Sequence, residues 1–227
     1  MNKTLETILK CDEKKLENTM LSYLKQMYGE DNIFHLRGYA ILAVGSIPIG
    51  LVAHMDTVVP KVEKLQESNG IVRAAWGLGA DDRAGIYSII KLINKGYRPT
   101  IIFTLQEETG GQGARVLTSC IDELKLKYLI QLDRHGKDDA VFYNCYNKAF
   151  KEYVCGFGFK EQQGVYSDIS FLCPAWDIAG VNLSIGYFYE HTNKELLNLE
   201  YMEETIAKVE KMLKAERFAE YFSYWEE

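Results

Sequence analysis

Short apolar segments of this sequence end, one after another, in acidic or histidine residues. Five runs have the length of a β-strand, at positions 39–44, 49–53, 71–75, 100–105 and 128–132, and a later apolar segment covers 181–189. The polar residues that follow four of these segments are His54 with Asp56, Glu107 with Glu108, Asp133, and Glu190 with His191. Ligands of open α/β sheets bind beyond the carboxyl ends of the strands, so we expect these side chains to meet at one edge of one sheet.

Segments with helical periodicity lie between and around these runs. Isoleucines recur at helical spacing in 86–93, residues 113–119 and 2–28 look helical, and apolar residues from Leu199 to Leu213 step by three and four. Thr192 and Glu195 have the spacing of a capping box for the last helix. This alternation predicts an α/β fold: a three-layer α/β/α sandwich with a mixed, mostly parallel central sheet.

The composition excludes several classes of function. The formal net charge is −6, which disfavours a nucleic-acid partner because phosphate binding requires a basic surface. The five cysteines are scattered and show no CxxC spacing, as is typical of thiols in a reducing compartment. The first residues lack the apolar run of a secretory signal, and the uncharged stretch 38–55 is interrupted by glycine and proline. We therefore expect a soluble, cytoplasmic protein that does not act at a membrane.

The acidic and histidine residues together form a set of metal ligands. A glycine-flanked acidic turn, 79–85, contains Asp81 and Asp82 and begins the isoleucine-rich helix. Packed carboxylates repel one another, so burying them requires a compensating cation. Two histidines with three or four carboxylates suit zinc or a similar divalent ion, and two ions can share one carboxylate.

These motifs resemble those of a known superfamily. The matching segments are His54-Met55-Asp56-Thr57-Val58, the acidic turn 79–85, Glu107-Glu108-Thr109-Gly110, Asp133 and His191-Thr192. In this order they resemble the successive motifs of the co-catalytic di-zinc exopeptidases, which include bacterial aminopeptidases, tripeptidase, glutamate carboxypeptidases and related amidohydrolases. The resemblance covers residues 51–195, about two thirds of the chain.

The resemblance implies a role for each matching residue. His54 and Asp133 would hold one divalent ion, Glu108 and His191 the other, and Asp81 would bridge the two. The ions would be zinc, with cobalt or manganese as alternatives. Asp56 would orient His54, and Glu107 would act as the general base that passes a proton from water to the leaving amine. The resemblance also implies a cis peptide bond after the bridging aspartate.

Each of these residues also has a structural interpretation. Asp56 and Asp133 could be turn residues, and Asp81 with Asp82 could be acids at a helix N-terminus. Glu107 and Glu108 could be exposed loop charges, and His191 could be a residue at a helix start. We expect His135, close after Asp133, to lie in a loop or to face the substrate. Ser167-Asp168 resembles a Ser-Asp element of some relatives and either lines the pocket or begins a helix.

The chain is too short for the second domain that many relatives insert. Only 27 residues separate His54 from Asp81, and 58 separate Asp133 from His191. We therefore expect residues 1–227 to form a single catalytic domain without a lid or dimerisation domain. Without such a domain, the sequence does not identify the residue that stabilises the oxyanion. The candidates are Arg134, Tyr166 and Tyr187.

The resemblance implies a metal-dependent exopeptidase, and we expect an aminopeptidase that acts on short peptides. One alternative is an amidohydrolase that deacylates small N-acyl amino acids at the same site, and another is a non-catalytic metal-binding protein. The sequence does not indicate oligomerisation, and the aromatic C-terminal residues could cover the core or a partner. These residues are Phe218, Tyr221, Phe222, Tyr224 and Trp225.

Overall fold

An eight-stranded sheet forms the centre of the computed structural model, which describes residues 1–215 and 220–225. Its strands, in spatial order, are β1 (Ile33–Leu36), β2 (Ala40–Ala43), β6 (Pro99–Thr104), β3 (Ile47–His54), β7 (Leu129–Arg134), β10 (Gly180–Ser184), β8 (Asp139–Val141) and β9 (Lys160–Gln162). The four central strands, β6, β3, β7 and β10, are parallel neighbours, and β8 pairs with β9 in parallel. The other three pairings are antiparallel, so the sheet is mixed and mostly parallel, as predicted.

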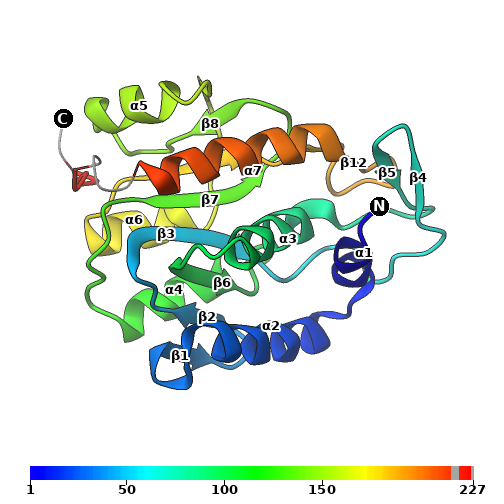
Figure 1. The fold of residues 1–227 in the computed structure, drawn as a ribbon, viewed down its shortest axis with the longest axis horizontal. Helices are drawn as coiled ribbons and strands as arrows, with labels where there is room; N and C mark the ends of the chain where they lie inside the picture. The colour runs from blue at the N-terminus through cyan, green and yellow to red at the C-terminus, as the bar shows by residue number, and fades with distance from the viewer. Residues whose placement is uncertain (216–219, 226–227) are drawn as a thin grey trace.

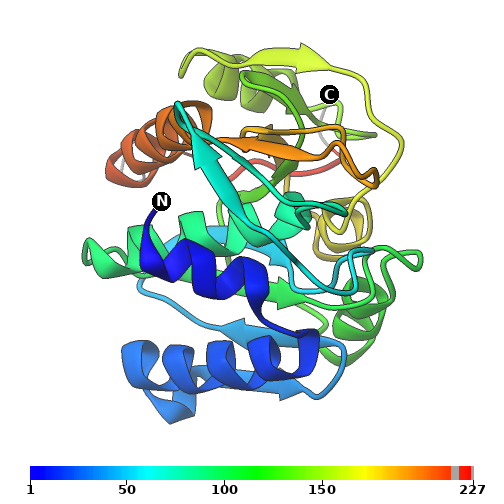
Figure 2. The same ribbon diagram turned by 90° about the vertical axis from the view of Figure 1, so that its right-hand side faces the viewer.

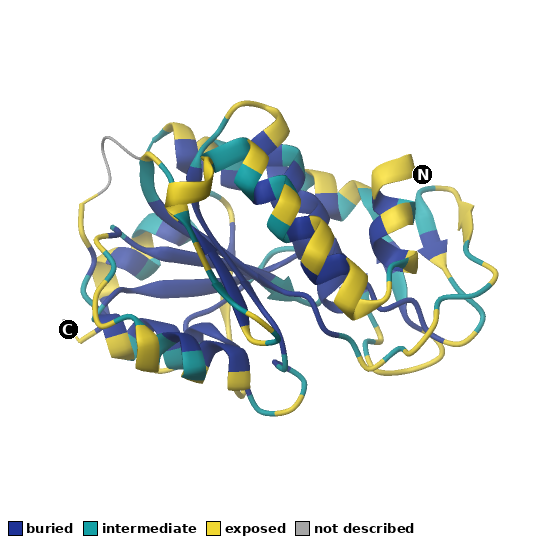
Figure 3. Ribbon diagram, turned by 90° about the horizontal axis from the view of Figure 1, so that it is seen from below, coloured by how far each residue is buried: buried dark blue, intermediate teal, exposed yellow. Residues whose placement is uncertain are grey.

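Helices cover both faces of this sheet. They are α1 (Lys3–Lys10), α2 (Glu13–Tyr28), α3 (Ala80–Asn94), α4 (Gln112–Cys120), α5 (Lys148–Cys155), α6 (Ile169–Trp176) and α7 (Leu199–Lys214), with a short 3₁₀ turn at Glu30–Asn32. On one face α3 packs against β3 and β7 and contacts α1 and α7, while α4 and α6 pack together on the other face (Figure 1). Figure 3 shows the buried strands between the two layers of helices, which confirms the three-layer α/β/α prediction.

The apolar runs of the sequence explain the buried centre. The strands β2 and β6 are buried at every residue, and the last six residues of β3 are buried as well. In α3 nearly every residue is buried, including the isoleucines that recur at helical spacing. Continuous apolar strands of this kind require cover on both faces, which the two helical layers provide.

A second, four-stranded antiparallel sheet lies at one end of the molecule. It contains β11 (Tyr187–Phe188), β12 (Leu196–Asn198), β5 (Ile71–Arg73) and β4 (Gln66–Ser68) in that order, and Figure 2 looks onto this end, where the cyan hairpin of β4 and β5 lies in front of the molecule. The sequence analysis treated 181–189 as one apolar segment. The chain instead turns at Gly186, whose φ of 92° is in the left-handed region, and divides the segment between the two sheets.

The predicted capping box at Thr192 and Glu195 is wrong. Helix α7 begins at Leu199, and the side chain of Asn198 accepts hydrogen bonds from the backbone N–H groups of Glu200 and Tyr201. An asparagine is among the preferred N-cap residues, so it satisfies the first turn of the helix without Thr192. The carboxylate of Glu195 instead accepts hydrogen bonds from the backbone N–H groups of residues 78–81.

The C-terminal aromatic residues pack partly on the core. Phe222 is buried, and its ring centre lies 5.2 Å from that of Phe150 and 5.5 Å from that of Tyr153. Tyr224 is also buried, whereas Tyr221 and Trp225 are exposed, and Phe218 lies outside the described residues.

Among the described residues, none of the helices has the length and apolar character needed to cross a bilayer.

We predict that Phe222→Ala destabilises the protein by about 3 kcal/mol, because it removes a buried aromatic side chain and leaves a cavity beside Phe150. A chemical denaturation curve measures this loss. Tyr146→Ala is the matched control, because Tyr146 is 67% exposed and its truncation should change the free energy of unfolding by less than about 0.5 kcal/mol. Equal losses in the two variants would show that Phe222 adds nothing to the core.

Candidate metal and active site

Three of the predicted site segments come from neighbouring parallel strands. His54 ends β3, Glu107 and Glu108 follow β6, and Asp133 lies in β7. Because β6, β3 and β7 are adjacent, their carboxyl ends bring these residues together, as the sequence analysis expected. His191 reaches the same place from a different origin, since it follows β11 of the small sheet and not a strand of the central sheet.

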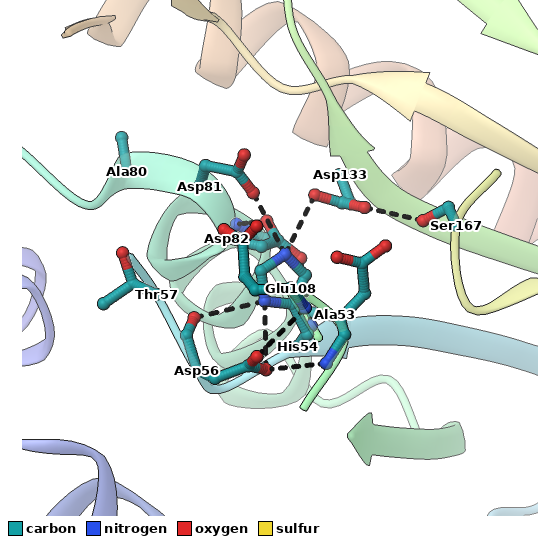
Figure 4. Close-up of polar contacts among 12 residues, drawn as sticks. Ala53, His54, Asp56, Thr57, Ala80, Asp81, Asp82, Glu108, Asp133 and Ser167 are labelled. Carbon is teal, nitrogen blue, oxygen red and sulfur yellow. Dashed lines mark hydrogen bonds and ion pairs between the residues drawn. The ribbon is translucent and has the colours of Figure 1, made fainter. Parts of the chain in front are cut away.

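Asp81 lies between the two imidazoles. Its Oδ1 atom is 3.0 Å from Nε2 of His54, and its Oδ2 atom is 3.1 Å from Nε2 of His191. Oδ1 of Asp133 lies 3.3 Å from the same nitrogen of His54, and Oε1 of Glu108 lies 2.9 Å from that of His191. The five residues therefore form two halves, each with one histidine and one further carboxylate, that share Asp81. Figure 4 shows Asp81 and Asp133 facing His54 from separate elements.

Asp56 fixes the position of the ring of His54 and of the segment after β6. Its Oδ1 atom is 3.4 Å from Nδ1 of His54, and its two oxygens accept hydrogen bonds from the backbone N–H groups of Glu107 and Glu108. The backbone oxygen of Asp56 is 3.1 Å from the same Nδ1 atom. Burial alone would raise the pKa of Asp56, but these hydrogen bonds outweigh it and lower the pKa. With Nδ1 used in this way, Nε2 of His54 is directed at the shared site.

Both oxygens of the Asp133 carboxylate accept hydrogen bonds, and Oδ1 accepts one from the hydroxyl of Tyr187 at 3.3 Å. The Oδ2 atom accepts hydrogen bonds from Oγ of Ser167, at 2.7 Å, and from Nε2 of Gln131, at 3.1 Å. This arrangement directs Oδ1 at His54. In the sequence Ser167 stands out only as part of a Ser-Asp element, and Gln131 was missed, because its one signal is a polar residue among the leucine and isoleucine residues that begin strand β7.

Asp82 is a neighbour of the site that has another role. It is fully buried and lies close enough to His54 and Asp133 to be considered as a ligand. However, its Oδ1 atom accepts the N–H of Gly85, and its Oδ2 atom accepts the N–H of His54. Asp82 therefore connects the start of α3 to the end of β3. The peptide bond between Asp81 and Asp82 is cis, as the resemblance implies.

Burial raises the pKa of several carboxyl groups in the cluster. It raises the pKa of Glu107 to about 9, with repulsion from Asp133 as the next cause, and the pKa of Glu108 to about 7, with repulsion from Asp81 next. The hydrogen bond with Asp81 raises the pKa of His191 to about 9. The metal-free protein thus retains protons on groups that would otherwise repel one another, and divalent cations would replace these protons. This donor set of two imidazole nitrogens and several carboxylates therefore fits such ions.

A small polar cavity of about 180 Å³ opens onto the cluster. Its wall includes Asp81, Glu107, Glu108, Asp133, Arg134, His135, Tyr143, Gly164, Val165, Tyr166, Asn182, Tyr187, Glu190 and His191. His135 lies on this wall, with Nδ1 2.6 Å from the carboxylate of Glu190, and its side chain makes no hydrogen bond or ion pair with the five-residue cluster within the described part of the chain. This placement is consistent with a loop or substrate-facing role for His135.

Comparison with known proteins identifies the fold. No family model matches the sequence, and no curated protein matches it. Among solved structures, an aminopeptidase PepT from Bacillus cereus has a TM-score of 0.71 at 17% identity, with 95% of this chain and 97% of that chain covered. A tripeptidase from Staphylococcus aureus has a TM-score of 0.70 at 14% identity, with coverages of 93% and 96%. The chain has the fold of these peptidases.

A further solved structure with this fold is the TET1 peptidase of Pyrococcus horikoshii, which can assemble into a tetrahedron or a large octahedral shell. Its TM-score is 0.64 at 16% identity, and 90% of this chain and 95% of that chain are covered. These solved structures therefore confirm the predicted fold. Fold alone does not determine activity, which depends on the residues of the site.

We predict that the metal-free protein loses stability as the pH rises from 5 to 8. A carboxyl group whose pKa is higher in the folded state than in the unfolded state binds its proton more tightly when folded, so its stabilising effect is lost as the pH rises. This applies to Glu107, between 4.5 and about 9, and the raised pKa of His191 acts in the same direction. Melting temperatures measured in a chelator at the two pH values test this dependence.

Glu107→Gln isolates the contribution of one group. At pH 8 this variant should melt above the wild type by at least about 2–4 °C, the shift that about 1 kcal/mol produces in a chain of this size, and at pH 5 the two should melt together. Glu190→Gln is the control, because the hydrogen bond with His135 lowers the pKa of Glu190 against the effect of burial. It should not gain stability at pH 8. An equal gain for Glu107→Gln at both pH values would contradict the assignment.

Proposed function

We propose that this protein is a metal-dependent aminopeptidase that hydrolyses short peptides. The observation that carries the proposal is the position of Asp81, whose two carboxylate oxygens each face a different histidine at about 3 Å. A bridging carboxylate between two sets of one histidine and one acid is an arrangement suited to a pair of divalent ions. The peptidase fold is consistent with this function.

The residues of the two halves would hold one ion each. His54 and Asp133 would bind one ion, His191 and Glu108 the other, and Asp81 both. Zinc is the ion that this combination of imidazole and carboxylate groups suits, with cobalt or manganese as alternatives. When bound, such ions lower the pKa of a coordinated water and polarise the carbonyl oxygen of the substrate.

Glu107 is the group that we propose as the general base. Its side chain is 8% exposed, lies on the wall of the cavity and accepts no hydrogen bond from any residue that the structure describes. Burial raises the pKa of this carboxyl group in the metal-free protein, and bound divalent ions would lower it again, so that Glu107 would be ionised and able to accept a proton. Glu107 would accept the proton of the attacking water and deliver it to the amide nitrogen as the amine leaves. Asp56 acts through His54 and through the backbone of Glu107.

The cavity supports a small substrate with a free amino end. Its volume of about 180 Å³ is below the roughly 300–1,000 Å³ of a typical ligand pocket, so the end of a peptide fits better than the middle of a long chain. The carboxylate of Glu190 lies on the wall outside the five-residue cluster and could bind an ammonium group.

All five cysteines are free thiols, which supports a location in the cytoplasm.

Tyr166 is the oxyanion-stabilising residue that we favour among the three candidates. The hydroxyl of Tyr187 is already committed to Asp133, at 3.3 Å, and the guanidinium of Arg134 donates to the backbone oxygen of Gln163. Tyr166 is 43% exposed and lies on the cavity wall, and its hydroxyl makes no hydrogen bond within residues 1–215 or 220–225. It is therefore free to donate to a charge that develops on the substrate.

We predict that Glu107→Gln lowers kcat on an aminoacyl-nitroanilide by at least 10²-fold and leaves the number of bound ions unchanged. The variant keeps the shape of the side chain but cannot accept the proton. Elemental analysis and steady-state kinetics on the same preparation measure the two effects. Parallel assays on N-acetyl amino acids distinguish an aminopeptidase from a deacylase. Full activity of this variant would refute the role of Glu107.

Asp81→Asn provides the contrasting result. The amide nitrogen of the new side chain cannot bind a cation, so we expect the occupancy of divalent ions to fall in both halves of the site. Activity should be lost as a consequence. The measurement is the ratio of metal to protein after dialysis against a weak chelator. Retention of two ions per chain would contradict the bridging role of Asp81.

We predict that Tyr166→Phe reduces kcat by about 10–100-fold with little change in KM, because it removes one hydrogen-bond donor to the transition state. The ring remains, so its packing against Phe171, with ring centres 6.2 Å apart, is preserved. Unchanged kcat in this variant would exclude Tyr166 and leave Arg134 as the next candidate.

A further inference from the structure

The carboxylate of Glu195 binds the backbone of the segment that carries Asp81. Its Oε2 atom accepts the N–H groups of Leu78, at 2.9 Å, and Gly79, at 2.7 Å. Its Oε1 atom accepts those of Ala80, at 2.8 Å, and Asp81, at 3.2 Å. Glu195 is 1% exposed, so the four bonds are shielded from water. Each oxygen accepts two donors, so the acceptor positions of this carboxylate are filled by backbone N–H groups.

These four N–H groups have no helical partner of their own. Gly79 adopts a left-handed conformation, with φ of 62°, and Asp81 and Asp82 are not helical although α3 formally begins at Ala80. The first N–H groups of a helix require an acceptor from elsewhere, and a negative charge at this end is favourable. Glu195 satisfies both requirements and fixes the backbone immediately before the carboxylate of Asp81.

The register of the small sheet explains why Glu195 lies there. In the antiparallel pair of β5 and β12, Arg73 is opposite Leu196. The segment that leads from β5 to Asp81 therefore starts at one end of this strand pair. The segment that follows His191 enters β12 at the same end. Glu195 is the last residue before β12 and follows His191 by four positions. Its hydrogen bonds thus connect the segments that carry two of the proposed ligands.

We propose that Glu195 is a positioning residue that holds Asp81 and His191 at the separation needed to bind a divalent ion between them. This inference rests on the proposed function, because it requires the dimetal site. The side chain of Glu195 itself is not a ligand, since both of its oxygens are occupied by backbone donors. Residues of this kind, which orient ligands from behind, typically change metal affinity by about 10–100-fold when they are replaced.

The test is the affinity for Zn²⁺ and the visible spectrum with Co²⁺, measured on folded protein. Glu195→Gln keeps the shape of the side chain but puts an amide N–H₂ group against two backbone donors, so we expect the weaker of two bound ions to lose at least about 10-fold in affinity. The Co²⁺ absorption bands should change in the same variant. Glu195→Asp keeps the charge with a shorter side chain, and its affinity should lie between those of the wild type and the Gln variant.

Glu17→Gln is the matched control. Glu17 is also a buried glutamate, 7% exposed, and it accepts the N–H of Gly38 at 2.8 Å and contacts Nε2 of His35 at 2.9 Å. Its replacement should lower the melting temperature without changing the affinity for metal or the Co²⁺ spectrum. This control separates a positioning role from a general loss of stability, because only the former changes the metal site of a folded protein.

The outcomes distinguish the inference from the proposal on which it rests. A wild type that binds no divalent ion would overturn the dimetal site and the inference with it. A wild type that binds two ions, with unchanged affinity in the Gln and Asp variants, would overturn only the role of Glu195. Equal losses of affinity in the Glu195 and Glu17 variants would also overturn it. Loss of affinity confined to the Glu195 variants would support it even if peptidase activity were absent.

Discussion

The site depends on the electrostatic balance around Asp81. Carboxylates buried side by side repel one another, and a protein keeps them together only where positive charge compensates. Here the two oxygens of Asp81 lie against two imidazoles, and Asp133 and Glu108 complete the two halves. Burial raises the pKa of Glu107 and Glu108 in this surrounding. The same crowding that destabilises the metal-free chain makes it a suitable receptor for divalent ions.

The backbone around the site holds this arrangement in place. Asp56 accepts the N–H groups of Glu107 and Glu108, Asp82 accepts those of His54 and Gly85, and Glu195 accepts those of residues 78–81. In each case a buried carboxylate that is not a proposed ligand accepts the backbone N–H group of a residue that is one. Such charge-assisted bonds are stronger than neutral ones, which explains how loops from two sheets keep a common geometry.

Much of the fold and of the proposed ligand set could be predicted from the sequence. The apolar runs that form β3, β6 and β7 are long enough to identify, and the polar residues after them stand out against the apolar residues that they follow. The role of Glu195 and the origin of His191 could not be predicted in this way. Both depend on the pairing of β5 with β12, which joins segments more than a hundred residues apart through backbone bonds that leave no side-chain pattern. Gln131 and the bond from Ser167 to Asp133 could not be predicted for a similar reason, because hydroxyl and amide groups are common and their partner Asp133 is recognised only in three dimensions.

The small sheet has a consequence for the dynamics of the molecule. Its strands are only two or three residues long, and two of the five residues at the site follow or precede them, whereas His54 and Asp133 belong to the buried central sheet. His191 thus follows a peripheral unit with few backbone bonds, whereas His54, Glu108 and Asp133 lie in or soon after strands of the central sheet. Local opening of that unit would move His191 away from the other proposed ligands without unfolding the core, so occupancy of the site and the closed state of this unit are linked thermodynamically.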